Sequence, residues 1–341
     1  MAEDLSPEQK LALVKQNLAE VLKPDVLEDI VLNQKRPLKI YWGTATTGRP
    51  HCGYFICIVK IAEFLRAGCR VKILLADIHG FLDNLKAPIE LVQFRAEYYK
   101  YVITSLLKAV NVPIEKLEFV TGSSYQLSKE YTMDLFRLSS VVTERDSKRA
   151  GAEVVKQVEN PTLSGLIYPL MQALDEQYLD VDVQFGGVDQ RKIFILAAEQ
   201  LTKIGYKERI HLMNAMVPGL AGGKMSSSDP DSKIDVLDPP EVVRKKLKKA
   251  HAVPKEVEGN GVISFVEYVL LPVSSLKTGG SGKFVVDRKD QEPLVYTGIE
   301  KLKEDYANDI VNPHTISDTN SSLMSPAHAS DAKTCRCYCV A

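Results

Sequence analysis

Residues 38–54 read LKIYWGTATTGRPHCGY and decide the fold of this chain. They begin with a short β-type run that ends at Gly43, and the apolar residues from His51 to Leu65 favour a helix. The small-residue loop between them predicts a strand–loop–helix turn, whose free backbone N–H groups and helix dipole suit a polyphosphate. His51 would donate to the phosphates, and Gly53 would let a nucleotide approach closely. A plain turn with a helix-capping histidine explains the same residues when they are taken alone.

Alternating strands and helices continue on the carboxyl side of this segment. Near-continuous apolar runs predict strands that are covered on both faces, and longer periodic stretches predict helices. The strands are expected at 38–42, 71–76, 117–120 and 181–185, and the helices at 51–65, 88–110, 128–142, 162–179 and 189–204. This alternation predicts an α/β fold with a Rossmann-like parallel sheet wrapped by helices. Because ligands bind at the carboxyl ends of such strands, residues 43–53, 77–79 and 186–190 are expected around one crevice.

The segments that flank this α/β region have a different character. Residues 6–35 read as helical after the helix start Ser6-Pro7-Glu8. Past Ile234 we expect a Lys/Arg-rich helix, a second helix over 262–271 and a mobile loop over 274–293. The predicted domains are an N-terminal helical segment (1–36), the α/β domain (37–234), a smaller and mostly helical domain (235–313) and a disordered tail (314–341).

The composition excludes several classes of protein. The chain has 341 residues, 45% of them hydrophobic, and a formal net charge of −1, so nucleic acid would have to bind at local basic patches. The first residues are polar and charged, and no apolar run approaches the roughly 18 residues that span a membrane. We therefore expect a cytoplasmic protein without a membrane span. Cys335, Cys337 and Cys339 lack the paired spacing of a zinc site, so no metal site is predicted.

A second segment suited to phosphate chemistry lies at residues 222–230, GGKMSSSDP. Glycines on one side and Asp-Pro on the other predict a loop that can move. Lys224 in such a loop would stabilise the charge that develops on a leaving pyrophosphate. The hydroxyls of Ser226, Ser227 and Ser228 would add hydrogen-bond donors. Taken alone, the segment is better explained as a flexible linker or a phosphorylation target.

Taken together, the two segments are far more specific. His51-Cys52-Gly53-Tyr54 and Lys224-Met225-Ser226-Ser227-Ser228 resemble the two signatures of class I aminoacyl-tRNA synthetases. Over residues 6–313 the chain resembles the eukaryotic cytoplasmic tyrosyl-tRNA synthetases, most densely at 41–48, 76–79, 172–175, 184–192 and 216–220. The resemblance implies a homodimeric ligase that activates L-tyrosine with ATP and transfers it to tRNA(Tyr). Many class I enzymes carry a second lysine at the position of Ser227, which puts only a two-lysine mechanism in doubt.

The resemblance also assigns a tyrosine pocket. It implies that Tyr41 and Asp175 bracket the phenol hydroxyl, and that Tyr168, Gln172 and Gln190 accept hydrogen bonds from the ammonium group. The spacing of Tyr168, Gln172 and Asp175 at i, i+4 and i+7 supports this independently, since it places all three on one helix face. Taken in isolation, Tyr41 reads as a core residue and Asp175 as a surface carboxylate. Asp77 and His79 are expected to border the pocket.

The ATP site follows from the same comparison. The expected contacts are Gly43, Thr46, His51, Gly53, Tyr54, Gly186, Gly187, Asp189 and Lys224. The tyrosine carboxylate would attack the α-phosphate in line, without a covalent enzyme intermediate, so that positioning and charge stabilisation supply the rate. Mg²⁺ would accompany the ATP phosphates rather than occupy a protein cage.

A basic cluster in the smaller domain is the candidate tRNA contact. It consists of Arg244, Lys245, Lys246, Lys248 and Lys249, which would meet phosphates if the helix that carries them faces RNA. A solvated helix surface is the alternative. The resemblance implies an anticodon-binding domain but stops after Pro313, which suggests an incomplete domain and a divergent tail. A truncated isoform that adenylates or binds tyrosine but charges tRNA poorly is therefore the alternative function. A synthetase for tryptophan is disfavoured by Tyr41 and Asp175.

Overall fold

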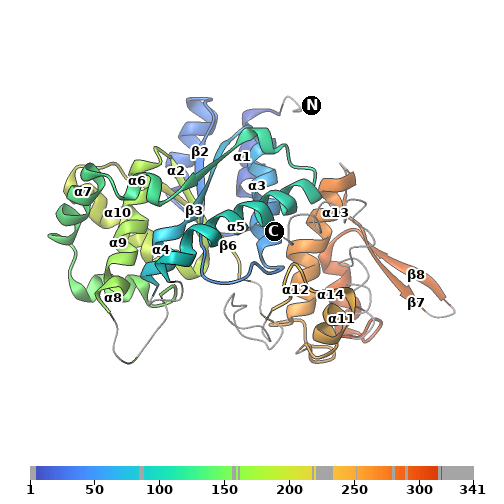
Figure 1. Ribbon diagram of the computed structural model, residues 1–341. Coiled ribbons are helices and arrows are strands. Elements are labelled where there is room, and N and C mark those ends of the chain that lie inside the picture. The colour runs from blue at the N-terminus through green and yellow to red at the C-terminus, as the bar shows by residue number, and fades with distance from the viewer. Residues whose placement is uncertain are drawn as a thin grey trace. The chain divides into compact units, whose positions relative to one another are not determined.

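The computed structural model describes the chain over most of its length (Figure 1). The described residues are 5–83, 88–155, 159, 162–216, 219, 233–250, 252–278, 281–288, 291–313 and 316. They fall into two compact units, which are treated separately below. The first unit comprises residues 1–48, 61–100 and 113–216, and the second comprises 49–60, 101–112 and 217–341. The domain limits predicted from the sequence stay a prediction.

The first unit contains the expected parallel sheet. In its described part the sheet has six strands in the order β1-β6-β5-β2-β3-β4. The strands are β1 (Leu18–Leu22), β2 (Lys39–Ala45), β3 (Arg70–Ala76), β4 (Leu117–Thr121), β5 (Val183–Gly187) and β6 (Ile210–Asn214). All neighbours pair in parallel except β1, which is antiparallel to β6. The strand order reverses between β2 and β5, and ligand sites in such sheets lie at the carboxyl ends of the two strands at that point.

The helices of the sheet region follow the predicted alternation. Their bounds are α1 (Pro7–Lys15), α2 (Pro24–Glu28), α3 (Tyr54–Arg66), α4 (Asp77–Leu82), α5 (Ile89–Ala109), α6 (Ser123–Gln126), α7 (Lys129–Ser139), α8 (Glu144–Gly151), α9 (Leu163–Tyr178) and α10 (Arg191–Gln200). Short π and 3₁₀ turns add η1 (Asp29–Asn33), η2 (Ile114–Lys116), η3 (Val188–Gln190) and η4 (Leu201–Ile204). Helices α3 and α5 each contribute residues to both units.

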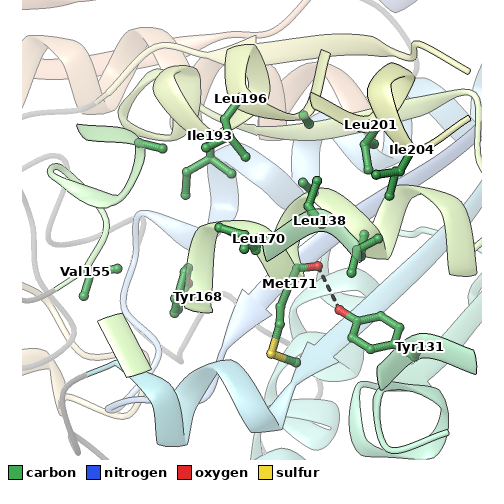
Figure 2. Close-up of a cluster of buried hydrophobic side chains, with 14 residues drawn as sticks. Tyr131, Leu138, Val155, Tyr168, Leu170, Met171, Ile193, Leu196, Leu201 and Ile204 are labelled. Atoms are coloured by element: carbon green, nitrogen blue, oxygen red, sulfur yellow. Dashed lines mark hydrogen bonds between the residues drawn. The ribbon is translucent and has the colours of Figure 1, made fainter. Parts of the chain in front are cut away.

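A buried apolar cluster fixes α9, the helix that carries three of the predicted pocket residues. Figure 2 shows side chains from α7, α9 and α10 meeting in this cluster, which includes Leu138, Leu170 and Ile193. The Tyr131 hydroxyl of α7 donates a hydrogen bond of 2.9 Å to the backbone carbonyl of Met171 on α9. Helix α9 is therefore held by packing along its length, which keeps its polar side chains in place.

The prediction of one helical stretch over 6–35 is wrong in part. Helix α1 starts as expected, with Ser6 capping the backbone N–H of Gln9, but residues Leu18–Leu22 form strand β1. Asn17 and Lys23, on either side of the strand, have φ angles of 57° and 60°, which interrupt a helix. The sequence also left β6 and α8 without a prediction. The edge strand β1 is defined by its pairing with β6, a long-range contact that local periodicity does not report.

The second unit is mostly helical, with a hairpin that was not expected. Its elements are α11 (Pro240–Lys248), α12 (Gly261–Phe265), the π-helix η5 (Val266–Leu270), α13 (Leu271–Thr278), β7 (Phe284–Arg288), β8 (Gln291–Tyr296) and α14 (Ile299–Ala307). The predicted loop over 274–293 is wrong, because α13 extends into it and β7 pairs with β8. Phe284 and Val286 point into the apolar core of this unit. Ile316 is buried in the same core, and the rest of the predicted tail lies outside the described residues.

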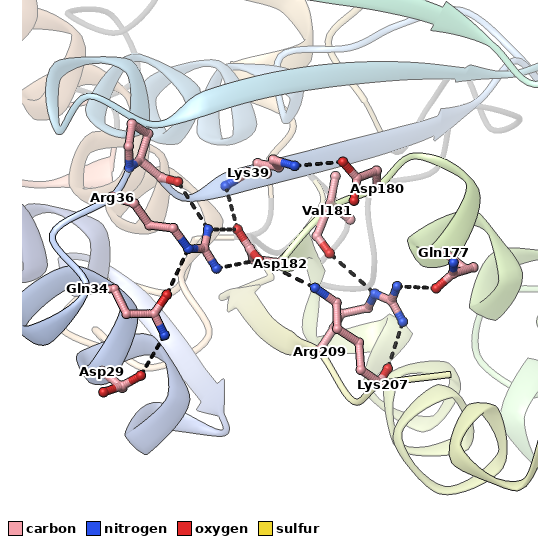
Figure 3. Close-up of polar contacts among 11 residues, drawn as sticks. Asp29, Gln34, Arg36, Lys39, Gln177, Asp180, Val181, Asp182, Lys207 and Arg209 are labelled. Carbon is pink, nitrogen blue, oxygen red and sulfur yellow. Dashed lines mark hydrogen bonds and ion pairs between the residues drawn. The ribbon is translucent and has the colours of Figure 1, made fainter. Parts of the chain in front are cut away.

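An ion pair between the half-buried Arg36 and the buried Asp182 ties the amino ends of β2 and β5 together (Figure 3). The Arg36 guanidinium donates to both oxygens of Asp182, at 2.6 and 2.9 Å, and the backbone N–H of Lys39 donates to the same carboxylate at 3.1 Å. Burial alone would raise the pKa of Asp182, but the hydrogen bonds from Arg36 and Lys39 hold that pKa below its ordinary value of 3.8. The carboxylate is therefore ionised and fully bonded at neutral pH.

Replacing Asp182 by asparagine is expected to lower the free energy of unfolding by about 1–3 kcal/mol at neutral pH, since hydrogen bonds to a charged group are lost. The native pKa is depressed, so this stabilisation is present above the unfolded pKa and disappears as the pH falls below 3.8. Urea denaturation at pH 7 and pH 3 measures both effects. An equal difference between variant and wild type at the two pH values would contradict the prediction.

Candidate active site

Helix α9 presents the predicted pocket residues of the first unit. Tyr168, Gln172 and Asp175 are buried, with exposed fractions of 6%, 8% and 0%. The side-chain amide of Gln172 donates to Oε1 of Gln190 at 2.8 Å, and Gln190 ends the short helix η3 that follows β5. The Tyr41 hydroxyl of β2 donates to the backbone carbonyl of Gln172 at 3.3 Å. The fold thus gathers the five residues assigned to the amino acid at the carboxyl side of β2 and β5.

The Asp175 carboxylate is held from one side. Its Oδ1 accepts hydrogen bonds from the Tyr125 hydroxyl at 2.7 Å, the Gln126 amide at 2.8 Å and the Tyr131 hydroxyl at 3.1 Å. Its Oδ2 is buried and has no hydrogen-bond partner among the described residues. Burial raises the pKa of Asp175 to about 7, although the same three donors act in the opposite direction. The carboxyl group is therefore poised between its two protonation states at neutral pH.

His79 lies at the Asp175 end of the pocket. The His79 ring lies edge-on to Tyr168, with ring centroids 4.6 Å apart, and its Nε2 is 3.8 Å from Oδ2 of Asp175. Burial lowers the pKa of His79 to about 4, so the imidazole is neutral at pH 7 and forms no ion pair with Asp175. Both ring nitrogens lack a hydrogen-bond partner within the described part of the chain. A ligand hydroxyl placed here would find one acceptor on Asp175 and further hydrogen-bonding capacity on His79.

Asp77 lies beside this group but is already engaged. Its Oδ1 accepts hydrogen bonds from the backbone N–H of Ile78 at 3.0 Å and of Ser123 at 2.8 Å. Ser123 is the first residue of α6, which carries Tyr125 and Gln126. Asp77 was expected to border the pocket as a binding residue. Its Oδ1 holds the start of α6, and its role in binding stays a prediction.

Two residues predicted to meet ATP lie near the carboxyl end of β2, Gly43 within the strand and Thr46 just after it. A Cβ on Gly43 would lie 3.5 Å from the Tyr41 ring and 3.6 Å from Leu74, which are ordinary contacts, so packing within the chain does not itself require glycine there. Thr46 is fully buried, and its Oγ1 has no hydrogen-bond partner among the described residues. The loop after β2 is held by the Tyr99 hydroxyl, which accepts from the Gly48 N–H at 3.3 Å. The close approach of a nucleotide is therefore the reason for Gly43 that stays a prediction.

The two glycines that end β5 are constrained by their neighbours. A Cβ on Gly187 would collide with the carboxylate of Asp189, and a Cβ on Gly186 would lie 2.8 Å from Oε1 of Gln190. Both glycines therefore let the residues of η3 fold back over the end of the strand. Packing within the chain is thus one reason for glycine at these two positions, and the predicted access of the nucleotide is another.

Replacing Gly186 by alanine is expected to raise the KM for the amino acid several-fold with little change in Tm. The new Cβ pushes against the flexible end of Gln190 and breaks its hydrogen bond with Gln172, while the backbone is not in the left-handed region. Steady-state kinetics and a thermal melt measure the two effects. A fall in Tm of more than about 5 °C would indicate a fold defect rather than a displaced side chain.

The first signature segment belongs to the second unit. Helix α3 begins at Tyr54, a few residues later than expected, and His51 forms an isolated antiparallel bridge with Asp235. The Gly53 N–H donates to Nδ1 of His51 at 3.2 Å, and burial followed by the charge of Lys233 lowers the pKa of His51 to about 4. Because Nδ1 accepts a hydrogen bond, the proton of the neutral ring is on Nε2, which is then a donor.

Residues shortly after the second signature segment are hydrogen-bonded to residues in and beside the first signature segment. The Cys52 N–H donates to the carbonyl of Ile234 at 2.9 Å, and Nζ of Lys233 donates to the carbonyl of Arg49 at 3.0 Å. Lys233 is buried, and sequence reasoning missed it. The predicted catalytic residues Lys224, Ser226, Ser227 and Ser228 lie outside the described residues. Residues 233–235, which follow that segment, are nevertheless bonded to His51 and its neighbours.

The basic cluster lies on α11 and at its carboxyl end. Val243 and Leu247 are buried, and the basic side chains lie at the positions around Leu247. Nζ of Lys246 bonds to Asp238 at 2.7 Å, so this cation is already neutralised. The other predicted contacts, which are exposed, are Arg244, Lys245, Lys248 and Lys249.

The described part of the chain offers neither a metal-ligand cluster nor a helix suited to a membrane. No group of three or more His, Cys, Asp or Glu side chains there is arranged to hold a metal ion. No described helix is both long and apolar enough to cross a membrane. The three C-terminal cysteines lie outside the described residues.

Comparison with known proteins places this geometry in a family. The family described as tRNA synthetases class I (W and Y) matches residues 33–318. The chain is 56% identical over 333 residues to the cytoplasmic tyrosine–tRNA ligase of Saccharomyces cerevisiae, which covers 95% of this chain and 84% of that protein. It is also 56% identical over 315 residues to the cytoplasmic tyrosine–tRNA ligase of Xenopus tropicalis, covering 92% of this chain but only 58% of that longer protein. The crystal structure of tyrosyl-tRNA synthetase complexed with L-tyrosine from Archaeoglobus fulgidus aligns with a TM-score of 0.85 and 34% identity, over 97% of this chain and 99% of that one. The chain therefore belongs to the class I tRNA synthetases of the tryptophan and tyrosine type.

Proposed function

We propose that this protein is a cytoplasmic tyrosine–tRNA ligase, which activates L-tyrosine with ATP and transfers the tyrosyl group to tRNA(Tyr). The observation that carries the choice of amino acid is the buried Oδ2 of Asp175, 3.8 Å from a neutral His79. A phenol hydroxyl satisfies this oxygen, whereas the ring edge of phenylalanine leaves it unpaired in a buried place. The relatives matched over most of the chain are named as tyrosine–tRNA ligases, which supports the same choice.

The amino acid would be oriented by groups at both ends. Its phenol hydroxyl donates to Asp175 and approaches the Tyr41 hydroxyl, whose pKa is raised well above 10 by burial and by the charge of Asp175, so that it stays protonated. The hydroxyl of Tyr168 and the amide oxygens of Gln172 and Gln190 are the acceptors offered to the ammonium group. These contacts leave the substrate carboxylate free to react.

The activation step needs no covalent enzyme intermediate. One carboxylate oxygen of tyrosine attacks the α-phosphorus of ATP, the bond to the bridging oxygen of the β-phosphate breaks, and pyrophosphate leaves with that electron pair. Nε2–H of His51, the N–H groups at the start of α3 and Lys224 are the proposed donors to the phosphates. The nucleotide contacts proposed in the first unit are Gly43, Thr46, Gly186, Gly187 and Asp189. Mg²⁺ would enter with the phosphates of ATP and keep several of its waters.

The tRNA and a second copy of the chain are the proposed macromolecular partners. The exposed cations of α11 are the proposed phosphate contacts. A homodimer is supported by three large apolar side chains on α7 and just before it, since Leu127, Met133 and Phe136 are 70%, 54% and 62% exposed. Sedimentation at micromolar concentration tests the dimer directly.

Two assays test the function as a whole. Tyrosine-dependent ATP–pyrophosphate exchange tests the pocket, and charging of tRNA(Tyr) tests the second step. Exchange with tryptophan but not with tyrosine would overturn the choice of substrate. Normal exchange with charging near zero would instead support the truncated-isoform alternative, which the identity to full ligases over 95% of the chain does not favour.

A further inference from the structure

A cage of donors around Asp175 is the least expected feature of the pocket. We propose that Tyr125, Gln126 and Tyr131 are positioning residues that set the tyrosine specificity: they hold Asp175 by Oδ1 and so reserve Oδ2 for the phenol hydroxyl of the substrate. This inference rests on the proposed function, because it concerns the same amino-acid pocket. None of the three residues belongs to either signature segment.

The geometry distributes the two carboxylate oxygens unequally. Oδ1 receives donors at 2.7, 2.8 and 3.1 Å, from α6 and α7, while Oδ2 receives none among the described residues. A carboxylate oxygen has about two lone-pair directions, so Oδ1 is saturated and cannot accept from a ligand as well. Rotation of the carboxylate would break these bonds inside a site that is 0% exposed at Asp175. Only Oδ2 remains available to the substrate.

The donors differ in strength. Tyr131 has a single hydroxyl proton, which it shares between Oδ1 of Asp175 and the carbonyl of Met171 at 2.9 Å. Tyr125 and Gln126 have no such competing acceptor in the described contacts. The Gln126 amide nitrogen must face Asp175, since the opposite orientation would set its carbonyl oxygen against the carboxylate. Tyr125 and Gln126 are therefore the stronger members of the cage.

The backbone before α6 is shaped to seat the cage. A Cβ on Gly122 would lie 2.6 Å from Oε1 of Gln126 and 2.8 Å from Oδ1 of Asp77, so only glycine fits without a shift. Asp77 holds the Ser123 N–H, and the Gln126 N–H donates to the Gly122 carbonyl at 2.9 Å. Asp77 and Gly122 thus fix the start of α6, and α6 in turn orients Asp175 through Tyr125 and Gln126.

The cage also acts on the charge of Asp175. Each donor favours the ionised carboxylate and so opposes the rise in pKa that burial causes. Removing one donor should raise the pKa of Asp175 further, and tyrosine binding should then need a higher pH. The titratable groups that face Asp175 are Tyr41 of β2, His79 of α4, Tyr125 of α6, Tyr131 of α7, and Tyr168 and Glu176 of α9 itself.

The test compares Tyr125→Phe and Gln126→Met with a matched control, Tyr206→Phe. The Tyr206 hydroxyl also donates to a carboxylate, that of Asp134, which keeps Tyr178 and Arg137 as donors when Tyr206 is removed. The measured quantity is the ratio of kcat/KM for tyrosine to that for phenylalanine in ATP–pyrophosphate exchange, together with KM for tyrosine from pH 6 to 9. Thermal melts establish that each variant is folded.

Both cage variants are expected to lower the ratio at least tenfold, chiefly through KM for tyrosine, and to move the acid limb of the KM profile to higher pH. The control should keep the wild-type ratio and profile. The proposal is overturned if the folded cage variants keep the wild-type ratio, or if Tyr206→Phe loses as much. If either variant does not fold, Tyr131→Phe replaces it with a smaller expected loss. Failure of wild-type exchange with tyrosine would instead refute the proposed function, so the two failures are distinguishable.

Discussion

Replacing Asp175 by asparagine is expected to lower kcat/KM for tyrosine activation by roughly 10²-fold, because a buried, charge-assisted hydrogen bond contributes up to about 3 kcal/mol. The asparagine keeps the shape of the carboxyl group but offers at most one acceptor oxygen. If that oxygen stays with Tyr125 and Gln126, an amide N–H faces the substrate hydroxyl. If the amide turns round, the cage donors are left unpaired. The first arrangement removes the acceptor that distinguishes tyrosine from phenylalanine, and the second breaks the cage that holds this side chain in place.

The same residue should give tyrosine activation a pH dependence. The pKa of Asp175 is about 7 in the ligand-free protein, and the bound phenol hydroxyl favours the ionised form. KM for tyrosine should therefore rise as the pH falls below about 7, approaching tenfold per pH unit, and level off above it. Asp175→Asn should abolish this dependence, since an amide does not titrate in this range.

A matched control separates the pocket from general damage. Asp134 is another carboxylate that accepts phenol hydroxyls, from Tyr178 and Tyr206, but none of its described hydrogen bonds reaches a predicted pocket residue. Asp134→Asn should cost stability and leave the KM profile unchanged. A flat wild-type profile between pH 6 and 8 would show that the ionised carboxylate of Asp175 is not the acceptor.

The sequence predicts the parallel sheet and the helix face of the pocket well, because both depend on local periodicity. The apolar runs of β2 and β3 mark strands covered on two faces, and the i, i+4, i+7 spacing on α9 groups Tyr168, Gln172 and Asp175. What it does not predict depends on distant pairing. Strand β1 is stabilised by its pairing with β6. The hairpin β7–β8 was missed because the residues around it are rich in Gly and Ser, which is typical of loops.

The donor cage shows the same limit within the site. Tyr125 is separated from Asp175 by 50 positions, and it lies on a helix of one turn that has no periodicity to detect. One signal was available: α6 follows the carboxyl end of β4, where ligand sites in parallel sheets are found. The electrostatic state of Asp175 and His79 could not be predicted either, since it arises from burial that only the packed structure defines.

Replacing His51 by asparagine is expected to lower kcat for ATP–pyrophosphate exchange by roughly 10²-fold, the usual effect of losing one donor to developing transition-state charge. An asparagine carbonyl can still accept the Gly53 N–H, as Nδ1 of His51 does at 3.2 Å. It places no donor where Nε2–H lies. Tyrosine affinity, measured by equilibrium dialysis, should change by less than about twofold.

His51→Gln is the matched variant, because its amide nitrogen extends to about the position of Nε2 and should restore part of the lost rate. The pKa of about 4 makes His51 neutral throughout the working pH range. The pH profile of kcat should therefore have the same shape near pH 6.5 in the wild type and in both variants. Equal losses for asparagine and glutamine would indicate that the ring matters through its contacts with Gly53 and Tyr54 rather than through a donated proton. A limb near pH 6.5 that only the wild type shows would mean that the imidazolium is the active form. The two variants and the pH profile together thus determine whether the first signature acts by hydrogen bonding from a neutral ring or by positive charge.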